Sequence, residues 1–220
     1  MKVKLISYSQ IPIDSDNTEC KNILDLVCYA ARVSNPLNQM NTSTNEKLSN
    51  YLMNNNHWSP FEMTSICLEI ETTRDIARQL LRHRSFSFQE FSQRYAIADL
   101  GFEEREARMQ DKKNRQNSIL SDNDKLNSEW IEKQNEVKNC TLSVYNWAIE
   151  NGIAKEQARA VLTEGNTISR LYVNGTLRSW IHYIQLRSGN GTQSEHKELA
   201  RECAKQIEPI FPFIVNFVSD

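Results

Sequence analysis

The stretch from Arg82 to Arg94 holds a dense set of chemically capable side chains: three arginines, one histidine and three serines within thirteen residues. A guanidinium is a planar set of donors that matches phosphate oxygens two at a time, and serine hydroxyls can bond the same oxygens. Phe86, Phe88 and Phe91 are interleaved with these groups, and a merely solvated basic face has little use for phenylalanine. The stretch therefore predicts a site for an anion such as a nucleotide phosphate, with a solvated basic face as the alternative.

Charge and hydropathy narrow the class of protein. The 220 residues have a formal net charge of -2, so the positive charge is local, and broad binding of nucleic acid is not expected. No apolar run approaches the roughly 20 residues that cross a bilayer, and the N-terminus turns polar too early for a signal peptide. We expect one domain over residues 1–220, located in the cytoplasm (the host cytoplasm for a viral chain) and binding no membrane.

The cysteines and histidines lack the spacings of a disulfide framework or a metal site. The five cysteines are scattered without a Cys-x-x-Cys pair, and the four histidines show no His-x-x-x-His spacing. No cysteine stands beside a histidine or within a basic cluster that would lower its pKa. We expect reduced thiols, no bound metal and no activated cysteine nucleophile.

Hydrophobic periodicity predicts an α+β fold, in which a mixed or antiparallel sheet packs against several helices, one of them long. Alternating apolar and polar residues indicate strands over 2–8, 64–71 and 168–173, the last ending in an Asn174-Gly175 turn. A hydrophobic tail over 211–218 is expected to pack or pair. Apolar residues at three- and four-residue steps predict helices over 20–33, 45–54, 74–84, 122–150, 154–162, 177–186 and 194–206.

These elements must position the polar groups. Helix 74–84 is expected to place Arg78 and Arg82 on one face, and helix 177–186 carries basic groups at about one-turn intervals. Glu156 and Arg159 are one turn apart. They either form an ion pair, which is slightly favoured, or Arg159 points into a pocket.

The charged segment 101–121 is a mobile excursion or a surface helix, and we assign it no function. The long helix is expected to bury Leu126, Trp130, Val137, Val144, Tyr145 and Ala148, and to stop at Gly152.

The arginine-rich stretch resembles the signature of flavin-dependent thymidylate synthases, Arg-His-Arg-x-x-Ser-x-Asn-x-x-Ser-x-Arg. Gln89 replaces the usual asparagine, which keeps the amide but lengthens its reach. Further landmarks follow in the family's order from about His57 to Glu195, so the resemblance covers most of the chain. The signature positions are Arg82, His83, Arg84, Ser87, Gln89, Ser92 and Arg94, and the other landmarks are His57-x-Ser-Pro-Phe-Glu62, Ala77-Arg78-Gln79, Glu156-x-Ala-Arg159, Leu186-Arg187, Gln193 and Glu195.

The resemblance implies a compact α+β domain that assembles as a homotetramer, with each active site shared between subunits. It also implies the conversion of dUMP to dTMP, with 5,10-methylenetetrahydrofolate (a folate) as carbon donor and FAD mediating hydride transfer from NADPH. In such an enzyme the protein mainly orients the reactants while the flavin performs the redox chemistry. This reaction suits a chain without an evident activated cysteine.

The family's roles carry over to matching positions. Arg187 is the implied catalytic residue, which contacts the uracil ring, favours ionisation at N3 and so polarises C5. Ser92 is expected to bind phosphate rather than act as a nucleophile, because no base is identified beside it. The implied flavin contacts are Ser59, Arg82, His83, Arg84, Glu90, Thr176, Arg178 and His182, and the implied dUMP contacts are Gln79, Arg82, Glu90, Ser92, Gln93, Arg94, Arg159 and Arg187.

Some positions depart from the family pattern or leave two interpretations open. Thr176 and His182 stand where asparagine is common, and Gly191 replaces a histidine of a loop over the flavin. His57 is either a flavin contact or a turn residue. The alternatives to a synthase are a non-catalytic nucleotide-binding module, which needs no flavin, and a related flavoenzyme that acts on a modified pyrimidine nucleotide.

Overall fold

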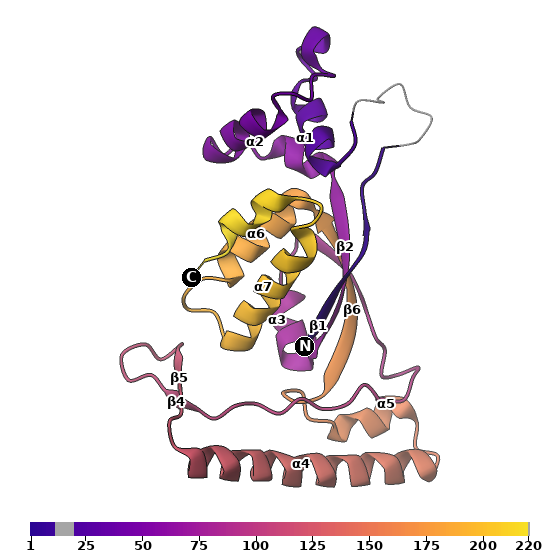
Figure 1. Ribbon diagram of the computed structural model, residues 1–220. Coiled ribbons are helices and arrows are strands. Elements are labelled where there is room, and N and C mark those ends of the chain that lie inside the picture. The colour runs from indigo at the N-terminus through magenta and orange to yellow at the C-terminus, as the bar shows by residue number, and fades with distance from the viewer. Residues whose placement is uncertain (12–19, 220) are drawn as a thin grey trace.

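A four-stranded sheet lies at the centre of the computed structural model, which describes residues 1–11 and 20–219 (Figure 1). All three neighbouring strand pairs are antiparallel. The expected α+β fold with an antiparallel sheet is therefore confirmed. In spatial order the strands are β1 (Lys2–Tyr8), β2 (Ser65–Thr73), β6 (Ile168–Thr176) and β3 (Phe86–Glu90).

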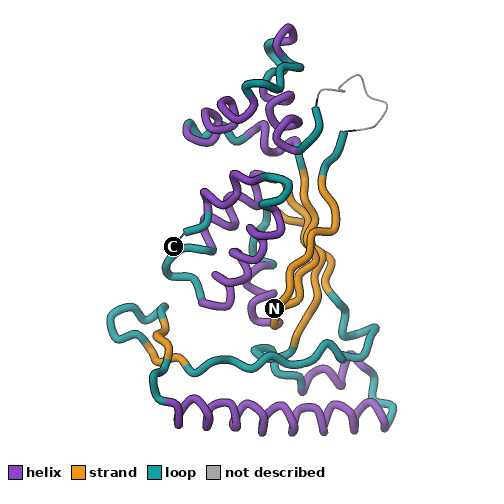
Figure 2. The backbone as a smooth tube through the Cα atoms, in the orientation of Figure 1, coloured by secondary structure: helices purple, strands orange, loops and turns teal. Residues whose placement is uncertain are grey.

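One face of the sheet is buried under helices α3 (Arg74–Leu80), α6 (Leu177–Arg187) and α7 (Ser194–Ile207), as Figure 2 shows. Alternate β2 residues Ile66, Leu68 and Ile70 point into this core and are fully buried, as the period of two predicted. The C-terminal tail packs there too. Its buried side chains are Phe211, which directly precedes a 3-10 turn over Pro212–Phe217, and Ile214 within that turn.

The other helices lie at the two ends of the sheet (Figure 1). Helix α2 (Asn45–Asn54) has the predicted bounds, whereas α1 (Ile23–Ala31) starts three residues later than predicted, because Asn22 caps it. At the opposite end lie the long helix α4 (Asp124–Glu150) and the short α5 (Lys155–Ala158). Gly152 follows α4 with a φ of 74°, the left-handed conformation expected of a helix stop.

Strand β3 was not predicted, and it changes the setting of the arginine-rich stretch. Helix α3 ends at Leu80 instead of continuing to 84, and the chain turns before Phe86 enters the sheet beside β6. The alternation of Phe86 and Phe88 with polar residues is the signal for this strand. Arg82 consequently lies beyond α3 and does not share a helical face with Arg78.

The predicted Asn174-Gly175 turn is wrong, because β6 continues through both residues to Thr176. Gly175 pairs with Ile66 on one side and with Phe86 on the other. A Cβ atom at this glycine would lie 2.3 Å from Cδ1 of Phe86. The glycine therefore allows the close approach of an aromatic ring rather than a reversal of the chain.

Two further expectations are corrected. Segment 101–121 contains no surface helix; it is extended and includes a small hairpin of β4 (Arg108–Gln110) and β5 (Ser118–Leu120). Only part of the apolar set predicted for α4 is buried. Tyr145 and Ala148 are buried, whereas Trp130, Val137 and Val144 are 42%, 50% and 42% exposed. No helix in the described part of the chain is long and apolar enough to cross a membrane.

Candidate active site

The end of helix α6 brings Arg187 to the histidine of the arginine-rich stretch. Arg187 Nε donates to His83 Nε2 at 2.9 Å, although 104 positions separate the two residues. Because Nε2 accepts, the neutral ring carries its proton on Nδ1. Burial, followed by the positive charge of Arg187, lowers the pKa of His83 to about 4. The pair therefore consists of a cation held by a neutral imidazole.

Arg82 and Arg84 flank this histidine and are exposed. Neither forms an ion pair with any residue in the ranges 1–11 and 20–219. Two exposed guanidinium groups without internal counter-ions fit an external anion, and phosphate oxygens match their paired donors. The geometry thus agrees with the anion site predicted from sequence.

Glu90, at the end of β3, has partners within the chain. Its carboxylate lies 3.3 Å from Arg74 Nη1 and 3.1 Å from Arg78 Nη1, and it accepts from Ser169 Oγ at 2.9 Å. Arg78 also contacts Glu164 at 3.3 Å. The arginines of α3 are thus neutralised internally, unlike Arg82 and Arg84.

At the far end of the stretch, Arg94 is exposed and Ser92 is half-buried. Ser92 Oγ accepts from the backbone N–H of Arg94 at 3.4 Å, and Gln93 beside it is buried. Glu156 contacts Arg94 at 3.5 Å, so the expected Glu156–Arg159 pair is wrong. The reason is local, since α5 ends before Arg159, which begins a separate 3-10 turn.

A second group of predicted residues lies along the first half of α6. Thr176 caps the helix by accepting from the N–H of Ser179 at 3.2 Å, and Arg178 pairs with Glu62. The His182 ring lies 5.0 Å from that of Trp58, and burial, followed by Arg178, lowers the pKa of His182.

Ser59 is exposed at the start of a 3-10 turn that ends at Met63, close in sequence to Trp58. His57 is exposed and edge-on to Tyr51 at 5.8 Å. Arg178 lies nine residues before Arg187, roughly 13 Å along the helix at 1.5 Å per residue, whereas His182 lies five residues before it. Ser179 Oγ in the first turn of α6 donates to the backbone carbonyl of Ser85 at 3.2 Å, so the arginine-rich stretch contacts both the first turn of this helix and Arg187 at its end.

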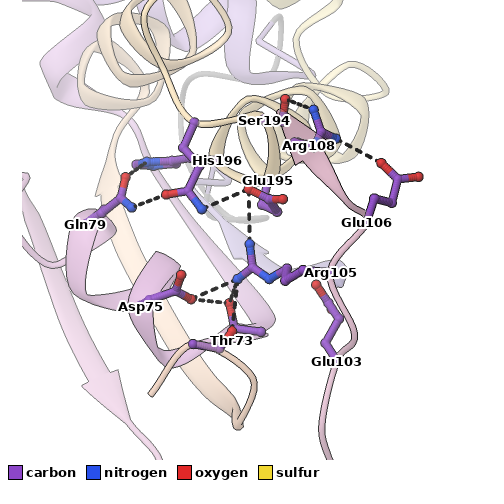
Figure 3. A network of polar contacts seen from close by, with 12 residues as sticks. Thr73, Asp75, Gln79, Glu103, Arg105, Glu106, Arg108, Ser194, Glu195 and His196 are labelled. Atoms are coloured by element: carbon purple, nitrogen blue, oxygen red, sulfur yellow. Dashed lines mark hydrogen bonds and ion pairs between the residues drawn. The ribbon is translucent and has the colours of Figure 1, made fainter. Parts of the chain in front are cut away.

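Three polar residues of the site were not predicted to have a role. His196 is fully buried and its Nδ1 lies 3.1 Å from Gln79 Oε1. Arg105, from the segment to which no function was assigned, contacts Glu195 at 3.0 Å and Asp75 at 2.9 Å (Figure 3). Glu195 was a family landmark without a role, whereas no local pattern marks Arg105, whose partners lie 30 and 90 positions away.

The thiols and the acidic groups offer little for nucleophilic or metal chemistry. Burial raises the pKa of Cys28 to about 11, and it also raises that of Cys203. Within residues 1–11 and 20–219, no group of three or more His, Cys, Asp or Glu side chains could hold a metal ion.

Comparison with known proteins identifies relatives that match nearly the whole sequence. The sequence profile of the family described as "Thymidylate synthase complementing protein" matches residues 17–213. A "Probable flavin-dependent thymidylate synthase" of Paramecium bursaria Chlorella virus 1 is 45% identical over 216 residues, 98% of each chain. A "Flavin-dependent thymidylate synthase" of Synechocystis sp. is 46% identical over 217 residues, 97% of each chain.

Among solved structures, the same fold occurs in a crystal structure of "a UMP/dUMP methylase PolB from Streptomyces cacaoi bound with 5-Br UMP". Its TM-score is 0.81 with 24% sequence identity, over 98% of this chain and 92% of that chain.

Proposed function

Because the chain belongs to the flavin-dependent thymidylate synthases, a family of methyltransferases, we propose that it converts dUMP to dTMP with 5,10-methylenetetrahydrofolate as carbon donor. FAD is the proposed flavin and NADPH the proposed hydride source. The observation that carries the proposal is the contact of Arg187 with His83, which lies between two exposed arginines that form no ion pair with any described residue. We further propose that residues 1–220 act as one domain in the cytoplasm.

The residues present fit an anionic dinucleotide. Arg82 and Arg84 are exposed cations, and their donors suit phosphate oxygens. Ser59, His83, Glu90, Thr176, Arg178 and His182 are the other proposed flavin contacts. The bound flavin would supply the redox chemistry, and the chain's own task is to bind and orient.

Arg187 is the proposed catalytic residue. Its Nε is engaged by His83, so the outer nitrogens of the guanidinium remain available for a uracil oxygen or N3. A fixed cation there stabilises negative charge on the pyrimidine ring and so polarises C5, without an enzyme nucleophile. The raised pKa of Cys28 and Cys203 supports this route, since a buried neutral thiol is a poor nucleophile.

The phosphate of dUMP is assigned to the Ser92–Arg94 end of the stretch. Ser92 offers a hydroxyl and Arg94 an exposed cation whose counter-ion Glu156 is itself half exposed. A pair between such exposed groups is weak, on the order of 0–1 kcal/mol, and a phosphate can displace it. Gln79, Gln93 and Arg159 complete the proposed substrate contacts with Arg82, Glu90 and Arg187.

A homotetramer with shared sites is part of the proposal. One observation supports it: α4 exposes an apolar stripe. Trp130, Val137 and Val144 of this stripe recur at seven-residue steps, the spacing with which helices pack against each other. A second copy of the chain would cover the stripe and bring further residues to the site.

The decisive experiment is dTMP formation from dUMP, methylenetetrahydrofolate and NADPH by the purified protein, with and without added FAD. We expect a flavin absorbance in the sample and FAD-dependent dTMP. A protein without flavin absorbance, which added FAD does not restore, would instead favour a nucleotide-binding module. Methylation of UMP or dCMP in preference to dUMP would favour the related flavoenzyme.

A further inference from the structure

A chain of side-chain amides connects a carboxylate to a buried histidine beside the candidate site (Figure 3). Gln193 Nε2 donates to Glu195 Oε2 at 2.9 Å, and Gln79 Nε2 donates to Gln193 Oε1 at 2.8 Å. Gln79 Oε1 then lies 3.1 Å from His196 Nδ1. Three contacts thus join α3, the loop before α7, and α7 itself.

Glu195, at one end of this series of hydrogen bonds, has a fixed role as an acceptor. Burial by itself raises the pKa of Glu195, but hydrogen bonds from its own backbone N–H and from Gln193, together with Arg105, lower it below the usual value. The carboxylate is therefore ionised at neutral pH and can only accept. It borders a polar cavity of about 480 Å³, also lined by Arg105 and Arg108.

The donor and acceptor roles of each amide determine the orientation of the next amide in the series. The acceptor at Glu195 requires the NH₂ group of Gln193 to face it, which turns the oxygen of Gln193 toward Gln79. Gln79 must then donate its own NH₂ and present its oxygen to His196. A ring nitrogen that faces this oxygen has to carry a proton.

We propose that His196 is a positioning residue: a neutral imidazole held in its Nδ1–H form by the polarised chain from Glu195, which fixes the Gln79 amide next to the substrate. The ring is fully buried and its Nε2 atom is also buried, with no partner among the described residues. A protonated ring would leave a charged N–H group unpaired there, at a large cost in free energy.

The surroundings of His196 also keep the ring neutral. Its ring centroid lies 5.8 Å from that of Tyr183 and 6.3 Å from that of His83. Burial, followed by Arg187 and His83, lowers the pKa of His196 to about 3. The rings of Tyr183 and His196 both pack against His83, which accepts the hydrogen bond from Arg187. His196 therefore supports the catalytic arginine by packing, and it supports Gln79 by a hydrogen bond.

The proton position can be measured on the complete protein with ¹⁵N-labelled histidine, since the protonated and bare ring nitrogens of neutral imidazole resonate far apart. The His196 signals are identified by their loss in a His196→Asn variant. We expect the Nδ1–H form at pH 7.5. An Nε2–H form or an imidazolium would overturn the proposal.

A matched pair of variants tests the origin of the polarity. Glu195→Asp keeps a carboxylate that can only accept and should leave His196 in the Nδ1–H form. Glu195→Met has a similar length but no acceptor, so Gln193 and Gln79 lose their fixed orientation and the Nε2–H form should appear. An unchanged Nδ1–H signal in the Met variant would contradict a role for Glu195.

The consequence for the substrate rests on the proposed function, in which Gln79 contacts dUMP. Asparagine at 196 places an amide N–H near the former Nδ1 atom, whereas glutamine places it near the former Nε2 atom. We expect His196→Gln to raise the KM for dUMP about tenfold, the scale of one lost hydrogen bond, with kcat and the flavin spectrum nearly unchanged. His196→Asn should recover most of the loss.

The histidine spectra and the kinetic measurements test different statements, so the positioning role and the proposed function can be rejected independently. Equal KM values in the Asn and Gln variants, or a loss confined to kcat, would overturn the positioning role while dTMP formation continues. Absence of dTMP formation by the unaltered protein would reject the proposed function, and the histidine spectra would still decide the state of His196.

Discussion

At the scale of single residues, arginines with similar sequence surroundings have different states. Arg74 and Arg78 share the carboxylate of Glu90, whereas Arg82 and Arg84 are exposed without an ion pair in the described part of the chain. Arg187 contacts a neutral histidine, which orients its guanidinium without cancelling the charge. The available positive charge is thus concentrated where an anionic ligand is proposed to bind.

This arrangement predicts separate roles for Arg187 and the flavin contacts. Arg187→Ala should lower the rate of dTMP formation by at least about a hundredfold, the scale of one lost charge-stabilising donor, while the flavin stays bound. Flavin absorbance after gel filtration and single-turnover dTMP formation measure the two effects. Arg201→Ala, an exposed arginine of α7, is the control and should retain activity. Loss of flavin from the Arg187 variant would argue for a binding role.

Ser92 is predicted to bind phosphate. Ser92→Ala should raise the KM for dUMP about three- to tenfold, because one hydrogen bond of about 1 kcal/mol is lost, with little change in kcat. Steady-state kinetics over a range of dUMP concentrations distinguish the two parameters. A collapse of kcat at saturating dUMP would indicate a nucleophile instead.

The half-buried His83 and the fully buried His196 predict a loss of stability in mild acid. Their pKa values are about 4 for His83 and about 3 for His196, against 6.5 for an unperturbed histidine. Below pH 6.5 the unfolded chain binds protons that the folded chain does not, so stability falls as the pH drops from 6.5 toward 4. The melting temperature should therefore decrease over this range, and less steeply in His196→Asn. Parallel decreases in the two proteins would contradict a neutral buried His196.

At the scale of elements, strand β3 packs closely against one glycine. The ring of Phe86 fills the space over Gly175 and packs 4.5 Å from the ring of Trp180. This contact fixes where the chain leaves the turn that carries His83, and so it contributes to the approach of Arg187. The elements of the site are thus placed by packing between β6, β3 and α6.

Gly175→Ala should destabilise the fold by about 1–3 kcal/mol, because the added methyl group would overlap the buried Phe86 ring and force it to move. Chemical denaturation measures the change. Gly165→Ala is a suitable control, since a Cβ atom there meets nothing within 4 Å. Equal stability of the two variants would show that β3 is not held by this contact.

At the scale of the whole molecule, helix α4 leaves an apolar stripe uncovered within one chain. Tyr145 and Ala148 pack in a small separate core with Ala158, while Trp130, Val137 and Val144 stay exposed. A sequence pattern reports that a face is apolar, but it does not report which molecule covers that face. The exposed stripe is consistent with the proposed tetramer.

Val137→Glu should therefore shift the protein from tetramer to smaller species and weaken flavin retention at the same time. A buried carboxylate without a partner is costly, whereas an exposed one is not. Light scattering and flavin absorbance on one sample measure both effects. Asn139→Glu, on the other side of α4, is the matched control. A dissociated variant that keeps its flavin and activity would contradict shared sites.

The sequence by itself determined the fold class, the bounds of β1 and α2, and the landmarks that identify the family. Those features depend on local periodicity and on motif spacing, which a single chain displays directly. Tertiary structure alone decided that 174–175 continues a strand, that Glu156 meets Arg94, and that Arg105 reaches Glu195. It also decided that His196 contacts Gln79 and that Arg187 donates a hydrogen bond to His83. Such contacts join distant positions through packing, and no local pattern encodes which partner a buried or charged side chain will meet.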